Sequence, residues 1–262
     1  MSDVVDGVRT ALHDDVLEVT LASPDVRNAQ TPGTWRRLAS IPDALTPEVR
    51  FVVLRGEGPS FSAGLDRRML TPEGVPGEPS LLDLSQRDAD TMDGFIQQAQ
   101  AAFTWWARIP QVSIALVQGH AIGAGFQLAL ACDVMIVAPD VKLAMRETSL
   151  GLVPDLGGTG PLLDRVGYSR ALEICATGRF VGSDEAVRLG LALRAVPQED
   201  WDIALDEMLT PIRAAMPSAV AELKTLLRGG SGGVDQLARE RESQVRRLTE
   251  LGALLTPTEG TS

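Results

Sequence analysis

A glycine-rich turn near the middle of the chain is followed by two carboxylates at a spacing that suits proton transfer beside backbone donors. Residues 119–125 hold three glycines and come directly after an apolar, largely β-branched run at residues 112–117. This order predicts a strand, a turn and then the start of a helix. Glycines let backbone approach a partner closely, and the free N–H groups of a helix start attract oxyanions. Glu147 and Asp155 follow the next predicted strand and are therefore candidates for acid-base work beside those donors.

An earlier segment, residues 60–66, has the sequence Ser-Phe-Ser-Ala-Gly-Leu-Asp and follows an apolar strand predicted at residues 51–54. It is typical of a tight loop with free backbone N–H groups. Gly56 and Gly58 just before it superficially match a dinucleotide-binding fingerprint. Pro59 stands where the helix should begin and the third glycine is missing, so the pattern argues against a nucleotide-dependent oxidoreductase.

Four segments in this order resemble the enoyl-CoA hydratase/isomerase family, also called the crotonase family. They are Pro-Asp-Val-Arg-Asn-Ala at residues 24–29, the strand and loop at 51–66, the glycine-rich turn and helix at 119–133, and the stretch from Glu147 to residue 159. The resemblance extends from about residue 16 to about residue 196. It implies an α/β fold, a spiral of repeated ββα units, with a helical C-terminal trimerisation region. We therefore expect an acyl-CoA-binding core at residues 1–196 and a helical region at residues 197–262 that mediates oligomerisation and covers the pocket.

The resemblance also implies an oxyanion hole. Carried over position by position, its two donors are the backbone N–H groups of Leu65 and Ala124. Two fixed donors in a dry site stabilise the negative charge that a thioester carbonyl gains as an enolate forms, and the helix dipole adds to the second donor. The alternative is that the glycines around these positions only allow strands and helices to pack closely.

Further binding residues are implied in the same way. A basic residue just before Asn-Ala lies beside the coenzyme A phosphates in the family, which favours binding by Arg27 over a solvated turn residue. His120 is expected to line the pocket or to hydrogen-bond backbone as a neutral imidazole. The full set expected to contact the substrate or its CoA moiety is Arg27, Ala29, Ala63, Gly64, Asp66, His120, Gly123 and Gln127.

The reaction depends on the side chains beside the oxyanion hole. Hydration of a 2-enoyl thioester in this family uses two glutamates that flank one water, and the matching positions here are Gln127 and Glu147. An amide cannot exchange a proton near neutral pH, and the loss of a general acid-base group typically costs about 10²–10⁴ in rate. Isomerisation of a 3-enoyl-CoA needs one carboxylate to remove a proton from C2 and return it at C4. The favoured hypothesis is therefore an enoyl-CoA isomerase that uses Glu147.

Two alternatives stay open at this point. One is an enoyl-CoA hydratase in which Gln127 positions the water and Glu147 or Asp155 supplies the proton. The other is an acyl-CoA-binding protein without turnover, suggested by the missing glutamate. Asp155 matches the second acid-base position of the dienoyl-CoA isomerases in the family, but its Pro-Asp-Leu-Gly-Gly context also suits a turn or a helix cap.

Composition excludes several classes of protein. The 262 residues are 44% hydrophobic, which suits a sizeable core, and 24 basic against 35 acidic residues give a net charge of −11, which argues against a nucleic-acid surface. The two cysteines and two histidines lack metal-ligand spacing, so we expect no metal and no tightly bound cofactor, with coenzyme A present only as the acyl carrier. No apolar run reaches about 20 residues, so a cytoplasmic enzyme without membrane contact is expected. The expected partners are an acyl-CoA thioester and further copies of the chain, as a trimer or a dimer of trimers.

The remaining elements must hold these residues in place. Strands are predicted at residues 16–21, 134–137 and 191–196, and a helix opens at Thr31-Pro32. Residues 71–93 are predicted to form a pocket lid or a surface loop with a short helix at 81–84. The apolar stripe of the following helix is interpreted as core, and it consists of Met92, Phe95, Ile96, Ala99, Phe103 and Trp106. Helices are predicted at 161–166, 169–176, 183–190, 201–209, 217–228 and 234–252, with a flexible Gly-Ser segment at 229–233.

Overall fold

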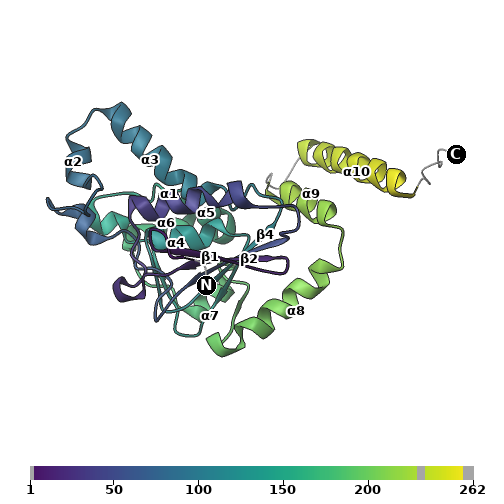
Figure 1. The fold of residues 1–262 in the computed structure, drawn as a ribbon, viewed down its shortest axis with the longest axis horizontal. Helices are drawn as coiled ribbons and strands as arrows, with labels where there is room; N and C mark the ends of the chain where they lie inside the picture. Colours follow the sequence, from purple (N-terminus) through teal and green to yellow (C-terminus); the bar gives the residue numbers. More distant parts are fainter. Residues whose placement is uncertain (1–2, 229–233, 256–262) are drawn as a thin grey trace. The chain divides into compact units, whose positions relative to one another are not determined.

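A mixed six-stranded sheet forms the framework of the computed structural model, which describes residues 3–228 and 234–255 (Figure 1). Its strand order is β1-β2-β3-β4-β6-β8, and only the β1–β2 pair is antiparallel. The strands span Val8–His13 (β1), Val16–Leu21 (β2), Phe51–Gly56 (β3), Val112–Val117 (β4), Val134–Val137 (β6) and Arg194–Ala195 (β8). The parallel pairs require crossover connections, and helices supply most of them, as expected for an α/β protein.

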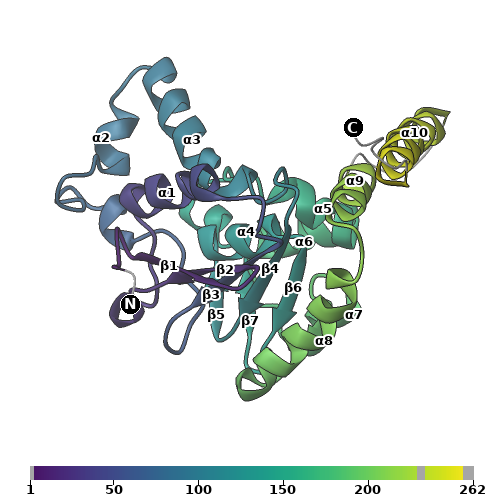
Figure 2. The ribbon, with the colours of Figure 1, turned by 45° about the vertical axis from the view of Figure 1, so that its right-hand side comes forward.

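The central strands are apolar because the sheet is covered. Phe51–Leu54 of β3 and residues 113–117 of β4 are fully buried, which explains their near-continuous hydrophobic runs. A series of helices, each packed on the next, covers one side of the sheet (Figure 2). They are Pro32–Ala39 (α1), Ala89–Thr104 (α3), Ala124–Ala131 (α4), Thr159–Val166 (α5) and Tyr168–Thr177 (α6). Trp35, Phe103 and Phe126 from these helices fill the core.

A second, two-stranded sheet is central to the site. It pairs His120–Ile122 (β5) with Lys142–Ala144 (β7) in parallel, with Ile122 opposite Ala144. Each strand of this small sheet follows a strand of the large one, since β5 comes after β4 and β7 after β6. The same order therefore delivers helix α4 after β5 and the 3-10 helix Glu147–Leu150 (η4) after β7, at the same end of the small sheet.

Local sequence explains several helix starts. Thr31 accepts a hydrogen bond from the Thr34 N–H in a capping box before α1 and Pro32 occupies the first turn. Ser80 caps Leu81–Ser85 (α2) in the same way, and Asp88 caps α3. The helix predicted to start at residue 169 begins one residue earlier, at Tyr168 directly after Gly167, and has no side-chain cap. The predicted strand at 191–196 is also shorter than expected, with only two residues paired in β8.

The chain divides into two compact units, residues 1–205 and residues 206–262, and helix Trp201–Arg213 (α8) spans the boundary. Helices Pro217–Arg228 (α9) and Val234–Leu255 (α10) pack on each other in the second unit. Apolar side chains of α10 are exposed at Leu237, Val245, Leu248 and Leu251. The role of this C-terminal region in trimerisation stays a prediction, and residues 229–233, predicted to be flexible, lie outside the described residues.

The remaining elements are short. They are the 3-10 helices Pro24–Val26 (η1), Ile41–Ala44 (η2), Arg67–Leu70 (η3) and Gln198–Asp200 (η5), and helix Ser183–Arg188 (α7). Across residues 3–228 and 234–255, no helix has both the length and the apolar character that a membrane span requires. The α/β class expected from the sequence is the class observed.

Candidate active site

The motifs identified in the sequence lie side by side, joined by backbone hydrogen bonds. The Ala63 N–H donates to Arg27 O at 2.8 Å and the Gln30 N–H to Gly64 O at 2.7 Å, which joins the first motif to the 60–66 loop. That loop pairs in turn with β5, since the Ile122 N–H donates to Ser62 O at 3.0 Å. The Gly123 N–H continues the ladder to Ala144 O on β7 at 2.8 Å. Segments separated by up to about 120 residues therefore form one layer at the site.

Glycines permit this close approach. Gly64 has a φ of +83°, and a Cβ there would lie 2.3 Å from Ile122 O and 3.5 Å from Ala124 N. A Cβ at Gly119, with a φ of +53°, would lie 2.0 Å from Pro59 O. Any side chain at either position would push the 60–66 loop away from the start of α4. Gly64 lines neither of the cavities described below, so its contribution is to bring these segments together.

The two backbone donors predicted for the oxyanion hole are unused in the described part of the chain. On either side of Leu65, the Gly64 N–H donates to Ser62 Oγ and the Asp66 N–H donates to Gln30 O, but the Leu65 N–H has no partner among the described residues. The Ala124 N–H is the first of α4, where no residue one turn back can accept it. Both residues line the larger cavity, and their role as an oxyanion hole stays a prediction.

Glu147 begins η4 and lines the same cavity as Leu65 and Ala124. Its Oε1 accepts a hydrogen bond from Gln127 Nε2 at 2.8 Å, while its Oε2 is buried and has no partner among the described residues. Burial raises the pKa of the Glu147 carboxyl above its ordinary value, and the negative charge of Asp155 adds to that rise while the Gln127 hydrogen bond opposes it. One oxygen of Glu147 is thus held by the protein and the other is free to take a proton.

Gln127 lies one turn into α4 and is 1% exposed. Its Oε1 accepts from the Leu156 N–H at 3.0 Å and from the Gly158 N–H at 3.2 Å. Together with the bond to Glu147, these contacts leave one amide N–H of Gln127 without a partner in the described structure. The pocket position expected for Gln127 is observed, but most of its hydrogen-bonding capacity is spent within the protein.

Asp155 shares the cavity with Glu147. The residue as a whole is exposed, yet the cavity wall partly desolvates its carboxyl and raises its pKa above the ordinary value. Helix α5 begins after Gly158 with no side-chain cap, so Asp155 does not act as its cap. The main-chain oxygen of Asp155 accepts from Gln100 Nε2 at 2.6 Å, which ties its loop to α3.

The larger cavity, which we call the apolar cavity, has a volume of about 800 Å³. Glu147, Asp155 and Gln127 lie on its wall together with Leu65 and Ala124. The rest of the lining is mainly apolar and comes from α2, α3 and the loop after η4. Representative side chains are Leu81, Leu84, Phe95, Ile96, Leu152 and Val153.

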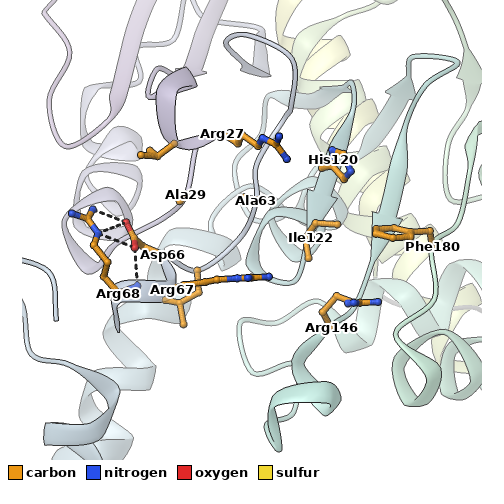
Figure 3. A pocket seen from close by; sticks show the side chains of 12 residues that line it. Arg27, Ala29, Ala63, Asp66, Arg67, Arg68, His120, Ile122, Arg146 and Phe180 are labelled. Atoms are coloured by element: carbon orange, nitrogen blue, oxygen red, sulfur yellow. Dashed lines mark hydrogen bonds and ion pairs between the residues drawn. The ribbon is translucent and has the colours of Figure 1, made fainter. Parts of the chain in front are cut away.

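A smaller cavity of about 490 Å³ lies next to it and shares Ala63, Leu65, Arg67, Ile122 and Arg146 with it. We call it the cationic cavity because four arginines line it, against one acid, Asp66 (Figure 3). Arg68 turns aside and pairs with Asp66 at 2.7 Å. Arg27 and Arg67 point into the space between the loops and have no hydrogen-bond or ion-pair partner among the described residues. On a chain with a net charge of −11, this is a local site for anions.

The other predicted binding residues fall in these two cavities. Ala29, Ala63, Asp66 and His120 line the cationic cavity, and Gly123 lines the apolar one. Burial and the nearby charges of Lys142 and Arg27 lower the pKa of the His120 imidazole below its ordinary value. His120 is therefore neutral near pH 7 and lines the cavity.

Sequence reasoning missed several lining residues. Arg67 and Arg146 line both cavities, and the Arg146 guanidinium stacks 5.5 Å from the Phe180 ring centroid. Arg67 directly follows the 60–66 loop and Arg146 directly precedes Glu147. A basic residue beside each of these motifs was the signal that could have identified them. The stripe interpreted as core is only partly core. Phe103 and Trp106 are buried, Ala99 is buried and also lines the apolar cavity, and Met92, Phe95 and Ile96 line that cavity. No periodicity distinguishes a helix face packed on a core from one packed on a ligand.

No cluster of three or more His, Cys, Asp or Glu side chains suited to a metal ion occurs within residues 3–228 and 234–255. The two cysteines are free, Cys132 buried and Cys175 partly so.

The chain is similar to known proteins in sequence and in fold. A family model described as enoyl-CoA hydratase/isomerase matches residues 12–260. The probable enoyl-CoA hydratase echA8 of Mycobacterium bovis is 31% identical over 70% of this chain and 65% of its own length. The mitochondrial Delta(3,5)-Delta(2,4)-dienoyl-CoA isomerase of Dictyostelium discoideum is 30% identical over 71% of this chain and 63% of its own length. This chain thus spans slightly less than two thirds of the length of these two relatives.

A crystal structure of a Thermobifida fusca YX protein in complex with acetoacetyl-CoA superposes with a TM-score of 0.88. It is 42% identical to this chain, and the match covers 94% of this chain and 96% of that protein. The family resemblance and the fold class predicted from the sequence are both confirmed.

Proposed function

We propose that this chain, which belongs to the enoyl-CoA hydratase/isomerase family, is an enoyl-CoA isomerase that uses Glu147 as its single acid-base residue. The observation that carries this proposal is the unpartnered, buried Oε2 of Glu147 in the same cavity as the free N–H groups of Leu65 and Ala124. A base and an oxyanion hole are the two components that proton transfer beside a thioester requires.

The proposed reaction moves one proton. Glu147 Oε2 removes a proton from C2 of a 3-enoyl-CoA, and the C–H electron pair forms a dienolate whose oxygen is stabilised by the two N–H groups. The same carboxyl then returns the proton to C4, the double bond forms between C2 and C3, and the thioester carbonyl is restored. No water, second base or redox step is needed.

The cationic cavity supports coenzyme A as the acyl carrier. Arg27 and Arg67 are free to pair with phosphate oxygens, and guanidinium groups suit phosphate geometry. The apolar cavity beyond Glu147 supports an acyl group of substantial apolar size, because its wall is built mainly from Leu, Ile, Val, Phe and Met side chains. CoA in one cavity and the acyl chain in the other would place the thioester between Leu65 and Ala124.

Hydration of a 2-enoyl-CoA is the second candidate. Asp155 favours it, because its carboxyl shares the apolar cavity with Glu147 and burial raises its pKa, so that it is a possible proton donor. The bonding of Gln127 counts against it, since only one N–H of that amide remains to hold a water.

The deciding experiment follows absorbance at the conjugated enoyl-thioester band while purified protein is given 3-enoyl-CoA and 2-enoyl-CoA substrates of several chain lengths in parallel. We expect the band to appear from the 3-enoyl substrates and to change slowly or not at all with the 2-enoyl ones. Rapid loss of the band from 2-enoyl-CoA would favour hydration. If tight acyl-CoA binding is measured by calorimetry but neither substrate reacts, the protein is a binding module.

A further inference from the structure

Gln127 connects the two segments that carry the carboxylates of the site. Its Nε2 donates to Glu147 Oε1 on η4 at 2.8 Å, and its Oε1 accepts from Leu156 and Gly158 in the loop at residues 154–158. That loop carries Asp155. One buried side chain therefore determines where both carboxylates lie relative to helix α4.

Only an amide satisfies all three contacts at neutral pH. The contact to Glu147 requires a donor, and the contacts to the two backbone N–H groups require an acceptor with two lone pairs. A carboxylate at position 127 would provide the acceptors but would lie beside the negative charge of Glu147, so the two groups would have to share a proton. An aliphatic side chain of similar size would leave buried N–H groups of Leu156 and Gly158 without a partner.

Two glycines hold the arrangement tightly. A Cβ at Gly158 would lie 2.6 Å from Gln127 Cγ, so the loop rests directly on the Gln127 side chain. A Cβ at Gly123 would lie 3.1 Å from Glu147 Oε1, so the held oxygen also packs against the backbone that leads into α4. Glu147 is restrained from both sides through Oε1, which leaves Oε2 as the oxygen without a partner among the described residues.

We propose that Gln127 is a positioning residue: its amide orients Glu147 so that Oε2 receives the substrate proton, and it holds the loop that carries Asp155 against α4. This inference rests on the proposed function only in taking Glu147 as the base. It also gives Gln127 a part in specificity, because an amide occupied in this way cannot exchange a proton with a water. In a hydratase of this family, this position supplies the second residue of an acid-base pair. In this chain, Gln127 at that position instead supports Glu147 as the single base.

The test compares Gln127→Leu with the parent and with Gln118→Leu as a matched control. Gln118 is also 1% exposed, and its Nε2 donates to the Gly56 and Gly58 carbonyl oxygens, away from the carboxylates. The rate of deuterium uptake at C2 of phenylacetyl-CoA is measured by mass spectrometry across pH. This exchange needs only the base and the oxyanion hole, so it does not depend on which overall reaction the enzyme catalyses.

We expect Gln127→Leu to lower the exchange rate by about 10²-fold, since small misplacements of a catalytic group have effects of that size. We also expect the acid limb of the pH profile to move up by about one pH unit, because a hydrogen bond that stabilises the carboxylate is lost. Gln118→Leu should lower thermal stability by about as much as Gln127→Leu does, and it should leave the acid limb of the pH profile unchanged. Gln127→Glu should keep the two loop contacts, yet also move the acid limb upward, because a second carboxylate beside Glu147 disfavours its charged form.

A second readout does not require turnover. The difference in melting temperature between the parent and Glu147→Gln changes with pH as Glu147 ionises. The pH midpoint of that change should be higher when the same pair is compared with Gln127→Leu present in both proteins. An unchanged midpoint together with an unchanged acid limb would overturn the inference. If no exchange occurs in the parent but the melting midpoint moves, the proposed function fails while the positioning role of Gln127 stands.

Discussion

The two cavities of the site share five lining residues but differ in how they are built. The cationic cavity is formed by loops, short 3-10 helices and strand β5, and its chemistry comes from charged side chains such as Arg27 and Arg67. The apolar cavity is formed largely by helices α2 and α3 and the loop after η4, and its chemistry comes from shape and apolar surface. Glu147 lies on the wall of the second cavity, close to the lining that the two share.

This difference shows why one half of the site is visible in the sequence and the other is not. A basic residue just before Asn-Ala matches a position of the family, so Arg27 was predicted as a binding residue through that resemblance. An apolar residue at helical spacing has an obvious structural reason, so Ile96 and Phe95 were interpreted as core. The comparison predicts that variants of the base, the cationic cavity and the apolar cavity will have separable effects on kcat, KM and chain-length preference.

The largest effect should come from the base between the cavities. Glu147→Gln is expected to lower kcat for 3-enoyl-CoA isomerisation by about 10²–10⁴-fold, because the general base is lost while shape is kept. Binding of a saturated acyl-CoA, measured by calorimetry, should stay within a few-fold of the parent. Glu199→Gln, in the surface helix η5, is the matched control. Loss of binding together with activity would mean that Glu147 holds the ligand instead of reacting with it.

A smaller effect is expected in the cationic cavity. Arg27→Gln and Arg67→Gln should each raise KM for acyl-CoA by about 10–100-fold, the value of one charged hydrogen bond, with little change in kcat. Steady-state kinetics at two salt concentrations would check this, and the difference from the parent should shrink at high salt. Arg170→Gln on α6 serves as the control. A fall in kcat at unchanged KM would break the separation between the two cavities.

The apolar cavity should show a graded effect. Each methylene added to the acyl chain is expected to raise kcat/KM by about 4-fold, the equivalent of about 0.8 kcal/mol of burial, until the cavity is full. Ile96→Trp should stop that rise at a shorter chain and leave the shortest substrate unaffected. Leu163→Trp, at an exposed position of α5, is the control. A flat dependence on chain length in the parent would show that the acyl group does not occupy this cavity.

The smallest effect concerns pH and stability. Burial raises the pKa of Glu147, so the protonated form is favoured by folding, and its contribution to the free energy of unfolding is lost as pH rises through the folded-state pKa. Glu147→Gln should therefore raise the melting temperature near pH 7 by about 2–4 °C and make no difference at pH 4. Calorimetric melting curves across pH would measure this. For the same reason, isomerase activity should fall with decreasing pH at a value above the ordinary pKa of a glutamate.

The sequence by itself determined the strands at residues 16–21, 112–117 and 134–137, because their hydrophobic runs and bounding turns are local features. It also determined which groups are present at the site. One of them is the amide of Gln127, at a position where hydration would use the second glutamate of a pair with Glu147. Resemblance then assigned Leu65 and Ala124 as donors, and the structure leaves both N–H groups free in the described chain.

Only the tertiary structure decided how these groups are used. The pairing of Ser62 with Ala121 and of Gln30 with Leu65 joins distant segments, and no local pattern specifies such partners. The three hydrogen bonds of Gln127 depend on a loop almost 30 residues away, which turned a residue expected to contact substrate into one that holds Glu147 in place. The physical reason is that periodicity and turn chemistry act over a few residues, whereas hydrogen-bond partners and burial are set by segments that meet only when the chain has folded.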